Sequence, residues 1–291
     1  MNKFLQKTRN KILKHIDTIP FVRYQGELNY QKAAENHIIN LPVISRNDLD
    51  LVEKIKAEGV VITSLADLEI PSTPQLLQAA KNLIPQIPQS NSSNDFVVHA
   101  SSQQIMEYPE IFLWGLEQRL LNIVEHYIGL PVAYHGAYFR RDLVKPLEIG
   151  SRLWHIDTEA RSIIKIIIYL NDISEDKGPF QYLPPDLTLK AVHSLNYKAG
   201  YISDKTMQEV ISPADYKSCT GYAGTVIFAA TSSIFHRGKI PTDTDRFAIF
   251  YDYTPRQKNL SFYGGSSLPN ADLILLEKGL SEQQKQCIFW Q

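Results

Sequence analysis

The chain of 291 residues has little cysteine, since Cys219 and Cys287 are its only two. Two isolated cysteines are too few for a disulfide framework or a cysteine-rich zinc site, so we expect a reduced, cytoplasmic protein. An excess of charge is lacking as well, because 30 Lys and Arg residues face 31 Asp and Glu residues. A dedicated nucleic-acid binder usually carries a basic excess, and we therefore expect no nucleic-acid partner.

Long hydrophobic runs are also missing. The most apolar stretch, residues 163–170, is far shorter than the roughly 20 residues that span a bilayer, and it contains Lys165. We therefore expect a protein without a membrane partner. The basic segment 1–17 fits either an organelle-targeting helix or a surface helix, and the lack of an apolar targeting core favours the surface helix.

The length and the hydrophobic content of 44% are sufficient for a large buried core. We expect a single domain over 1–291. It divides into a mainly helical N-terminal region (1–130), a β-rich core (131–265) with an insertion at about 187–222, and a C-terminal segment (266–291). No pattern fixes the oligomeric state.

The N-terminal region is predicted to be mostly helical. Asn47 or Asp48 is expected to cap a helix that ends at Gly59, and residues 60–63 are expected to form a strand. Apolar residues recur three or four positions apart over 109–128. This spacing predicts one long helix with a single buried face.

From Pro131 onward, short apolar and β-branched runs alternate with Gly, Pro, Asp and Asn. This texture predicts antiparallel sheets folded as a sandwich or barrel, with helices packed outside. The expected strands are 133–140, 162–170, 179–183, 224–229, 234–237, 246–253 and 260–263. The irregular segment 187–222 is expected to carry lids or substrate contacts.

One short motif indicates chemistry. His155 and Asp157 flank Ile156 in an extended segment, so both side chains point to the same face. A third ligand, His236, from a neighbouring strand would complete two histidines and one carboxylate on one face of a metal ion. That set is typical of non-haem Fe(II) oxygenases and leaves coordination positions open. Because an isolated His-x-Asp is common by chance, the motif alone does not exclude ordinary packed side chains.

A second feature supports the interpretation of this motif as an oxygenase metal site. Arg246 opens the apolar strand 246–253, and a buried guanidinium is costly unless it meets an anion. Its planar fork suits a carboxylate, and the distal carboxylate of 2-oxoglutarate is such a partner.

In the order and spacing of its motifs, the sequence resembles the phytanoyl-CoA dioxygenase-like family of Fe(II)- and 2-oxoglutarate-dependent oxygenases. The resemblance covers about 133–254, whereas the helical region before it fits only loosely. The matching motifs are Trp154-His155-Ile156-Asp157-Thr158, Tyr169-Leu170-Asn171-Asp172, Lys177-Gly178-Pro179-Phe180, Leu183-Pro184, Gly224-Thr225-Val226-Ile227-Phe228, His236 and Arg246.

The resemblance implies a double-stranded β-helix (jelly roll, cupin-like) of the α+β class. It further implies that His155, Asp157 and His236 bind Fe(II), that Arg246 grips 2-oxoglutarate, and that O2 is the second cosubstrate. Helpers of Arg246, chosen by expected position alone, are Tyr138, Thr158 and Lys165. The implied reaction is hydroxylation of an unactivated C–H bond with release of succinate and CO2, ahead of desaturation or cyclisation, because related halogenases replace the carboxylate that Asp157 retains.

The chain departs from the family at three points. Pro184-Pro185 stands where a Pro-Gly-Ser-His motif is frequent, Ile156 replaces a polar residue between the ligands, and Ala248 replaces a Ser or Thr that shares the cosubstrate carboxylate. The usual contacts at these positions therefore do not transfer.

The substrate is predicted less sharply than the cofactor. Apart from the N-terminal segment, no cluster of Lys and Arg suits the phosphates of an acyl-CoA, so we expect a free small molecule. Family habits favour a specialised-metabolite intermediate, for instance an alkaloid. Candidate substrate contacts are Arg140, Arg152, Phe180 and Tyr182.

Two other functions remain open at this stage. The same His, Asp and His ligands are able to hold zinc for hydrolysis, although that function gives Arg246 no role. A non-catalytic jelly-roll binding protein is the other alternative, and an intact triad beside Arg246 disfavours it.

Overall fold

A computed structural model describes residues 20–90, 92, 94–256 and 265–290. The strands in this part of the chain are β1 (Val60–Ser64), β2 (Val97–His99), β3 (Val132–Asp142), β4 (Ile164–Tyr169), β5 (Phe180–Tyr182), β6 (Lys217–Cys219), β7 (Thr225–Ala229), β8 (His236–Gly238) and β9 (Arg246–Pro255). The α-helices are α2 (Pro20–His37), α3 (Arg46–Glu58), α4 (Leu65–Leu68), α5 (Thr73–Leu83), α6 (Ser102–Glu107), α7 (Glu110–Trp114), α8 (Gln118–Ile128), α9 (Pro185–Ser194), α10 (Asp204–Gln208), α11 (Asn270–Leu276) and α12 (Glu282–Ile288). The helix expected over 1–17 and the strand expected over 260–263 lie outside the described residues.

The larger sheet has the strand order β1-β7-β4-β9-β3-β2, and every neighbouring pair is antiparallel. Successive side chains along each strand point to opposite faces of this sheet. On β4, Ile164, Ile166 and Ile168 belong to one hydrophobic cluster, whereas Ile167 and Tyr169 belong to another. Both faces of this sheet are therefore covered.

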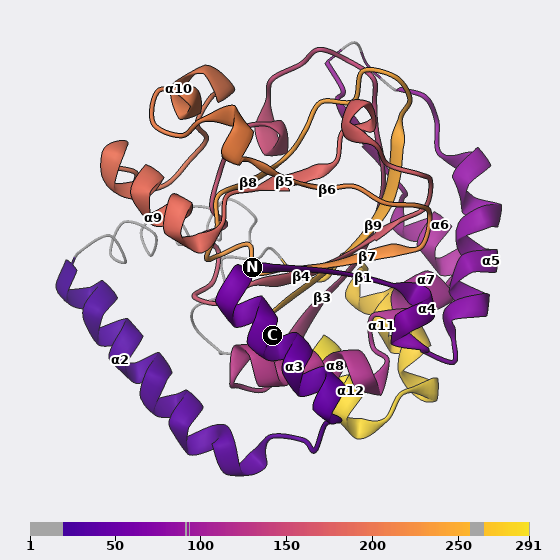
Figure 1. Ribbon diagram of the computed structural model, residues 1–291. Coiled ribbons are helices and arrows are strands. Elements are labelled where there is room, and N and C mark those ends of the chain that lie inside the picture. The colour runs from indigo at the N-terminus through magenta and orange to yellow at the C-terminus, as the bar shows by residue number, and fades with distance from the viewer. Residues whose placement is uncertain (1–19, 91, 93, 257–264, 291) are drawn as a thin grey trace.

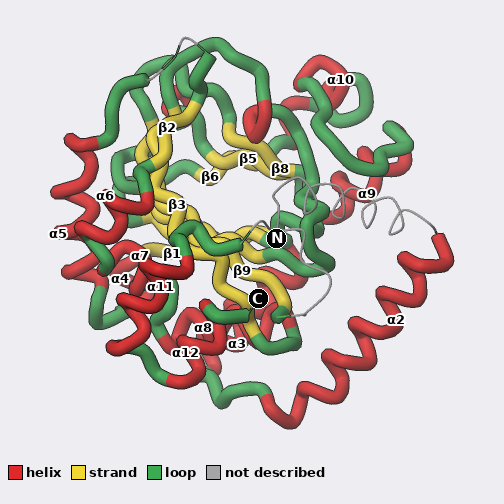
Figure 2. The backbone as a smooth tube through the Cα atoms, turned by 180° about the vertical axis from the view of Figure 1, so that it is seen from behind, coloured by secondary structure: helices red, strands yellow, loops and turns green. Residues whose placement is uncertain are grey.

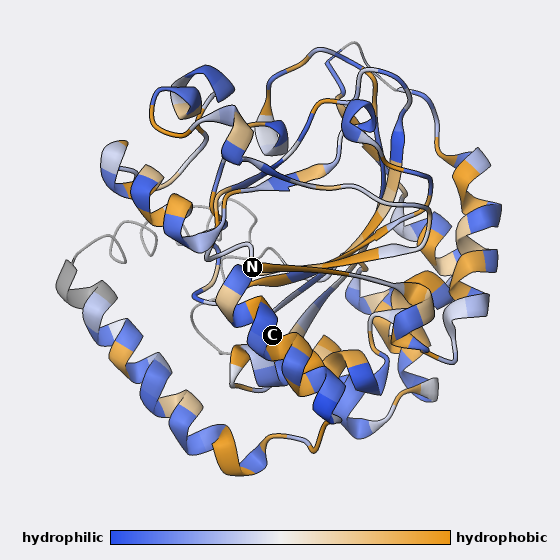
Figure 3. Cartoon of the chain, viewed as in Figure 1, coloured by the Kyte–Doolittle hydropathy of each residue, from blue (hydrophilic) through white to orange (hydrophobic). Residues whose placement is uncertain are grey.

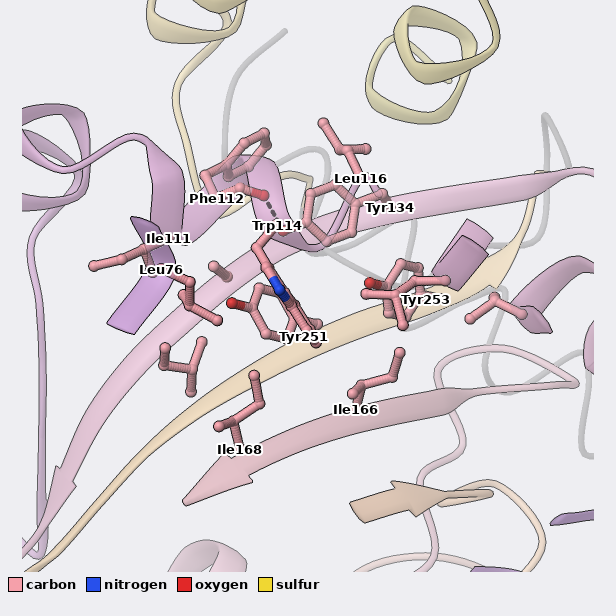
Figure 4. Packing of buried hydrophobic residues seen from close by; sticks show 14 of the residues in the cluster. Leu76, Ile111, Phe112, Trp114, Leu116, Tyr134, Ile166, Ile168, Tyr251 and Tyr253 are labelled. Carbon is pink, nitrogen blue, oxygen red and sulfur yellow. Dashed lines mark hydrogen bonds between the residues drawn. The ribbon is translucent and has the colours of Figure 1, made fainter. Parts of the chain in front are cut away.

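Helices cover the outer face of the larger sheet. In Figure 1, α3, α8 and α12 lie below the strands and α4 to α7 lie beside them. Figure 4 shows Trp114 of α7 against Tyr251 of β9, and Tyr134 of β3 donating a hydrogen bond to the Phe112 carbonyl at 2.9 Å. Figure 3 shows hydrophobic strands through the middle of the molecule and a mostly hydrophilic α2. The core is thus built between sheet and helices.

The smaller sheet, in the order β6-β5-β8, faces the inner side of the larger one (Figure 2). Between the two sheets lies a second buried cluster that includes Tyr169, Phe180, Ile227 and Ala248. Two facing antiparallel sheets with helices outside confirm the expected jelly roll of the α+β class.

The structure corrects two local predictions in the N-terminal region. Ser45, not Asn47 or Asp48, caps α3, because its hydroxyl accepts a hydrogen bond from the backbone amide of Asp48 at 3.1 Å. The single helix expected over 109–128 is instead α7 and α8, interrupted by 115–117. A Cβ on Gly115 would come within 2.5 Å of the Tyr134 hydroxyl, so the chain approaches the sheet closely where the helix breaks.

The strand expected at 60–63 is confirmed as β1, which pairs with β7 at the edge of the larger sheet. The insertion at 187–222 contains most of α9, all of α10 and β6, and its apolar residues form a third cluster with Trp154 and Phe235. Among the described residues, no helix has both the length and the apolar character needed to cross a membrane.

Candidate metal centre

His155 and His236 lie directly opposite each other. The segment before β4 runs antiparallel to β8, and the two histidines form a bridge in which each amide donates to the other's carbonyl, at 3.1 and 2.9 Å. Paired residues on adjacent strands present their side chains to the same side. The two imidazole rings are consequently 4.2 Å apart between centroids.

The backbone also fixes which ring nitrogen is available. Nδ1 of His155 lies 2.9 Å from the Leu153 carbonyl oxygen, and Nδ1 of His236 lies 3.2 Å from that of Ile234. A carbonyl only accepts, so Nδ1 is the protonated nitrogen in each ring. Nε2 of both rings therefore carries a lone pair, which is the arrangement of a metal-ligating histidine with an oriented partner.

Asp157 supplies the third ligand atom. Its amide donates to the Thr231 carbonyl at 3.0 Å, which ties the segment to the end of β7. Its Oδ1 lies 3.6 Å from Nε2 of His155 and 3.8 Å from Nε2 of His236, while Oδ2 lies 2.9 Å from Nζ of Lys165. Lys165 thus holds one carboxylate oxygen and leaves the other facing the imidazoles.

All three residues are in the protonation state that metal binding requires. Burial, and then the neighbouring His155, lower the pKa of His236 to about 3, and burial also lowers the pKa of His155. Burial opposes ionisation of Asp157, but Lys165, His236 and His155 together outweigh it and hold the pKa of Asp157 well below its usual range. Neutral imidazoles and an ionised carboxylate therefore coexist at neutral pH.

The donor set fits a divalent ion. The three ligand atoms lie within 4.8 Å of one another. Ligands at about 2.1 Å from one ion lie roughly 3 Å apart when they are at right angles, so small side-chain movements close the set. Two imidazoles and one carboxylate on one side match the facial arrangement of non-haem iron sites.

Arg246 lies in a buried charge cluster between the sheets. It is 2% exposed and pairs with Asp142, its register partner on β3, through Nε at 3.2 Å and a terminal nitrogen at 2.9 Å. The other terminal nitrogen donates to the carbonyl of Gly178. Arg140 binds the same carboxylate through Nε at 2.9 Å.

This cluster carries one unbalanced positive charge, because two guanidiniums share the single carboxylate of Asp142. Burial opposes ionisation of Asp142, yet Arg140 and Arg246 lower its pKa to about 2. One carboxylate of a ligand would balance the cluster. The residues therefore fit a ligand that is anionic at this end.

Gly238 connects the metal ligands with this cluster along β8. It lies two positions after His236 on β8, and a Cβ there would be 3.1 Å from a terminal nitrogen of Arg246. Positions two apart on a strand share a face, so His236 and the missing side chain of Gly238 lie on the same face of β8, beside Arg246.

The other residues predicted from the sequence are distributed around this site. Tyr138 is partly buried on β3, and Thr158 is exposed with its amide donating to Glu159 at 2.9 Å. The ammonium group of Lys165 pairs with the carboxylate of Asp157, with 2.9 Å between Nζ and Oδ2.

The predicted substrate contacts have mixed environments. Arg140 belongs to the cluster at Arg246, whereas Arg152 directs its terminal nitrogens to the backbone carbonyls of Phe96, Leu143 and Lys145. The ring of Phe180 stacks on His236 with 5.5 Å between centroids, and Tyr182 is partly buried on the same strand. Arg152 therefore supports the chain structurally.

Sequence reasoning missed Asp142, Gly238 and Asp252. Their significance depends on which strands pair and in which register, and a single sequence does not show this. The one available signal was the buried charge implied at the strand start by Arg246, which requires a nearby anion.

Comparisons with known proteins give no match to any family model or to any curated protein. Among solved structures, the chain is similar to the non-haem α-ketoglutarate-dependent carbocyclase SnoK from nogalamycin biosynthesis, with 17% identity and a TM-score of 0.49 over 77% of this chain and 86% of that one. It is also similar to EctD from S. alaskensis with 2-oxoglutarate and 5-hydroxyectoine, with 18% identity and a TM-score of 0.49 over 75% and 78%.

A third similar structure is HygX from Streptomyces hygroscopicus with nickel, 2-oxoglutarate and hygromycin B bound. It shares 15% identity and a TM-score of 0.49 over 79% of this chain and 94% of that one. At these values the similarity carries no argument, and the assignment of function rests on the site itself.

Proposed function

We propose that the protein is an Fe(II)- and 2-oxoglutarate-dependent dioxygenase that hydroxylates a C–H bond of a small molecule. His155, Asp157 and His236 would hold the iron, and Arg246 with Arg140 would receive the distal carboxylate of 2-oxoglutarate. One observation supports this most strongly: β8 carries His236 of the intact ligand set and, two positions on, Gly238, whose Cβ position lies beside the Arg246 guanidinium of a cluster with one surplus positive charge.

When bound, iron and 2-oxoglutarate would supply the activation of dioxygen, with succinate and CO2 as products. The chain's own residues would prepare the site. The carbonyls of Leu153 and Ile234 orient the two imidazoles, and Lys165 orients Asp157. Apolar residues such as Phe180 and Ala248 limit the access of water between the sheets.

Two alternatives explain fewer of these features. A zinc hydrolase uses the same ligands but gives no role to the surplus charge at Arg246 and Arg140. A non-catalytic binding protein has no need for imidazoles oriented by backbone carbonyls.

The proposal is tested by the variant Asp157→Ala. Removal of the only charged ligand should weaken Fe(II) binding and abolish 2-oxoglutarate-dependent succinate formation, measured with purified protein and Fe(II). Asp50→Ala, which removes an exposed carboxylate on α3, is the matched control and should keep wild-type rates. Succinate formation at the wild-type rate in Asp157→Ala would refute the ligand assignment.

A further inference from the structure

Asp252 is a buried carboxylate that the proposed reaction does not use. It lies on β9 at the far end of the inward face from Arg246, and its register partner on β4 is Lys165. It is 7% exposed. Its Oδ2 is 3.8 Å from Nζ of Lys165, and its Oδ1 has no hydrogen-bond partner within the described part of the chain.

A buried carboxylate oxygen with no donor is expensive, because desolvation is not repaid by a hydrogen bond. Lys165 compensates Asp252 only in part, since it lies closer to Asp157 (2.9 Å) than to Asp252 (3.8 Å). Burial raises the pKa of Asp252, which reflects the same unmet need for a cation or a donor. Such a cost usually persists at a site that a ligand completes.

The position of Asp252 places this need beside the metal ligands. Lys165 contacts both Asp157 and Asp252, so the two carboxylates flank one ammonium group. The exposed Tyr201 of the insertion has its ring 5.1 Å from that of His155. Tyr201 and Asp252 therefore both lie close to groups of the candidate metal centre.

The charges at this end differ in sign from those at Arg246. The charged groups that act on Asp252 are Lys165, Asp157, Arg140 and Glu159. Arg140 is bound to Asp142. Asp157 and Asp252 therefore share the single ammonium of Lys165, and Oδ1 of Asp252 still lacks a donor within the described part of the chain.

We propose that Asp252 binds a protonated amine of the primary substrate beside the metal centre, so that the substrate is an amine-bearing small molecule. This inference rests on the proposed function. The two ends of the inward face would then divide the ligands by charge: the anionic cosubstrate at Arg246 and the cationic substrate group at Asp252. A direct pair between carboxylate and ammonium is also the contact that most strongly rejects neutral analogues.

The test uses full-length protein loaded anaerobically with Fe(II) and 2-oxoglutarate. Binding of hexylamine and glucosamine is measured by thermal shift and compared with their neutral counterparts hexanol, N-acetylhexylamine and N-acetylglucosamine. Wild-type protein should bind at least one amine roughly tenfold more tightly than its neutral counterparts, and Asp252→Asn should remove that preference. Asp50→Asn, which makes the same charge change at an exposed position, should retain it.

The wild-type comparison needs no variant, so a folding defect in Asp252→Asn leaves it decisive. Equal binding of amines and neutral counterparts by wild type, or no amine binding at all, would overturn the inference, as would an unchanged preference in Asp252→Asn. The visible absorption of the Fe(II)–2-oxoglutarate complex distinguishes a failure of this inference from a failure of the proposed function. Its presence in wild type without amine preference refutes the inference alone, and its absence refutes the proposed function.

Discussion

At the scale of single residues, most contacts of the candidate site follow from the need of buried charged side chains for partners of opposite charge. Arg246 indicated from the sequence that an anion must lie nearby, and the structure provides one in Asp142 before any ligand is considered. The sequence did not reveal this partner because the pairing depends on β3 and β9 meeting in one particular register. Arg140 then supplies the surplus charge for which we propose a ligand carboxylate as the partner.

Asp142→Asn should destabilise the protein by about 3 kcal/mol at neutral pH, because two buried guanidiniums lose their carboxylate. The folded-state pKa of Asp142, about 2, lies below its ordinary value of 3.8, so its ionisation stabilises the fold above pH 4. This contribution, about 2 kcal/mol, is lost as the pH falls from about 4 toward 2. Urea unfolding of wild type and variant from pH 7 to pH 3 should show the difference shrinking at the acid end. A difference in unfolding free energy that stays constant from pH 7 to pH 3 would contradict this prediction.

Gly238→Val should obstruct the space between His236 and Arg246, since even a Cβ there would lie 3.1 Å from the guanidinium. The KM for 2-oxoglutarate should rise at least about tenfold while Fe(II) affinity stays near wild type. Gly279→Val, at a glycine with no atom within 4 Å of a Cβ, is the control and should change neither. An unchanged KM in Gly238→Val would show that the cosubstrate lies elsewhere.

At the scale of elements, the sequence predicted strands better than helix boundaries. Short apolar and β-branched runs indicated β3, β4 and β9, since strands that are packed on both faces need apolar residues along most of their length. The break between α7 and α8 was not predicted, because the apolar spacing continues through it. The approach of Gly115 to Tyr134 and Tyr251 causes the break, and only the folded structure shows that contact.

Gly115→Ala should therefore cost about 1–3 kcal/mol, because the added methyl group overlaps the Tyr134 hydroxyl and the Tyr251 ring, at 2.5 and 2.6 Å. Gly279→Ala, in open surroundings, should change stability by less than about 0.5 kcal/mol. Urea denaturation at neutral pH measures both. Equal stability of the two variants would mean that α7 does not need its close approach to the sheet.

The insertion shows the same limit of prediction. Its irregular sequence indicated a functional segment, but not how it is attached. Asp204 of α10 accepts a hydrogen bond from the Trp154 indole at 3.1 Å and pairs with Arg237 at 2.8 Å. These two partners directly precede His155 and follow His236. The insertion is therefore coupled to the strands that carry both histidine ligands.

At the scale of the whole molecule, the near-neutral composition hides a separation of charge. The inward face of the larger sheet is cationic near Arg246 and acidic near Asp252. Of the residues next to the metal ligands, Gly238 lies beside Arg246, and Lys165 lies beside Asp252. The order of motifs along the sequence was sufficient to predict the jelly roll and the meeting of His155, Asp157 and His236 at one point. The separation of charge required the strand register, because it arises from residues far apart in sequence.

Iron and 2-oxoglutarate are proposed to bind together between the His155–Asp157–His236 set and Arg246. Anaerobic titration of the protein with Fe(II), followed by 2-oxoglutarate, tests it most directly. Chelation of Fe(II) by the oxo acid should produce a weak visible charge-transfer band that saturates at one equivalent of iron and is lost in Asp157→Ala. A folded, iron-loaded wild-type protein that stays colourless at saturating 2-oxoglutarate would contradict joint binding at this site.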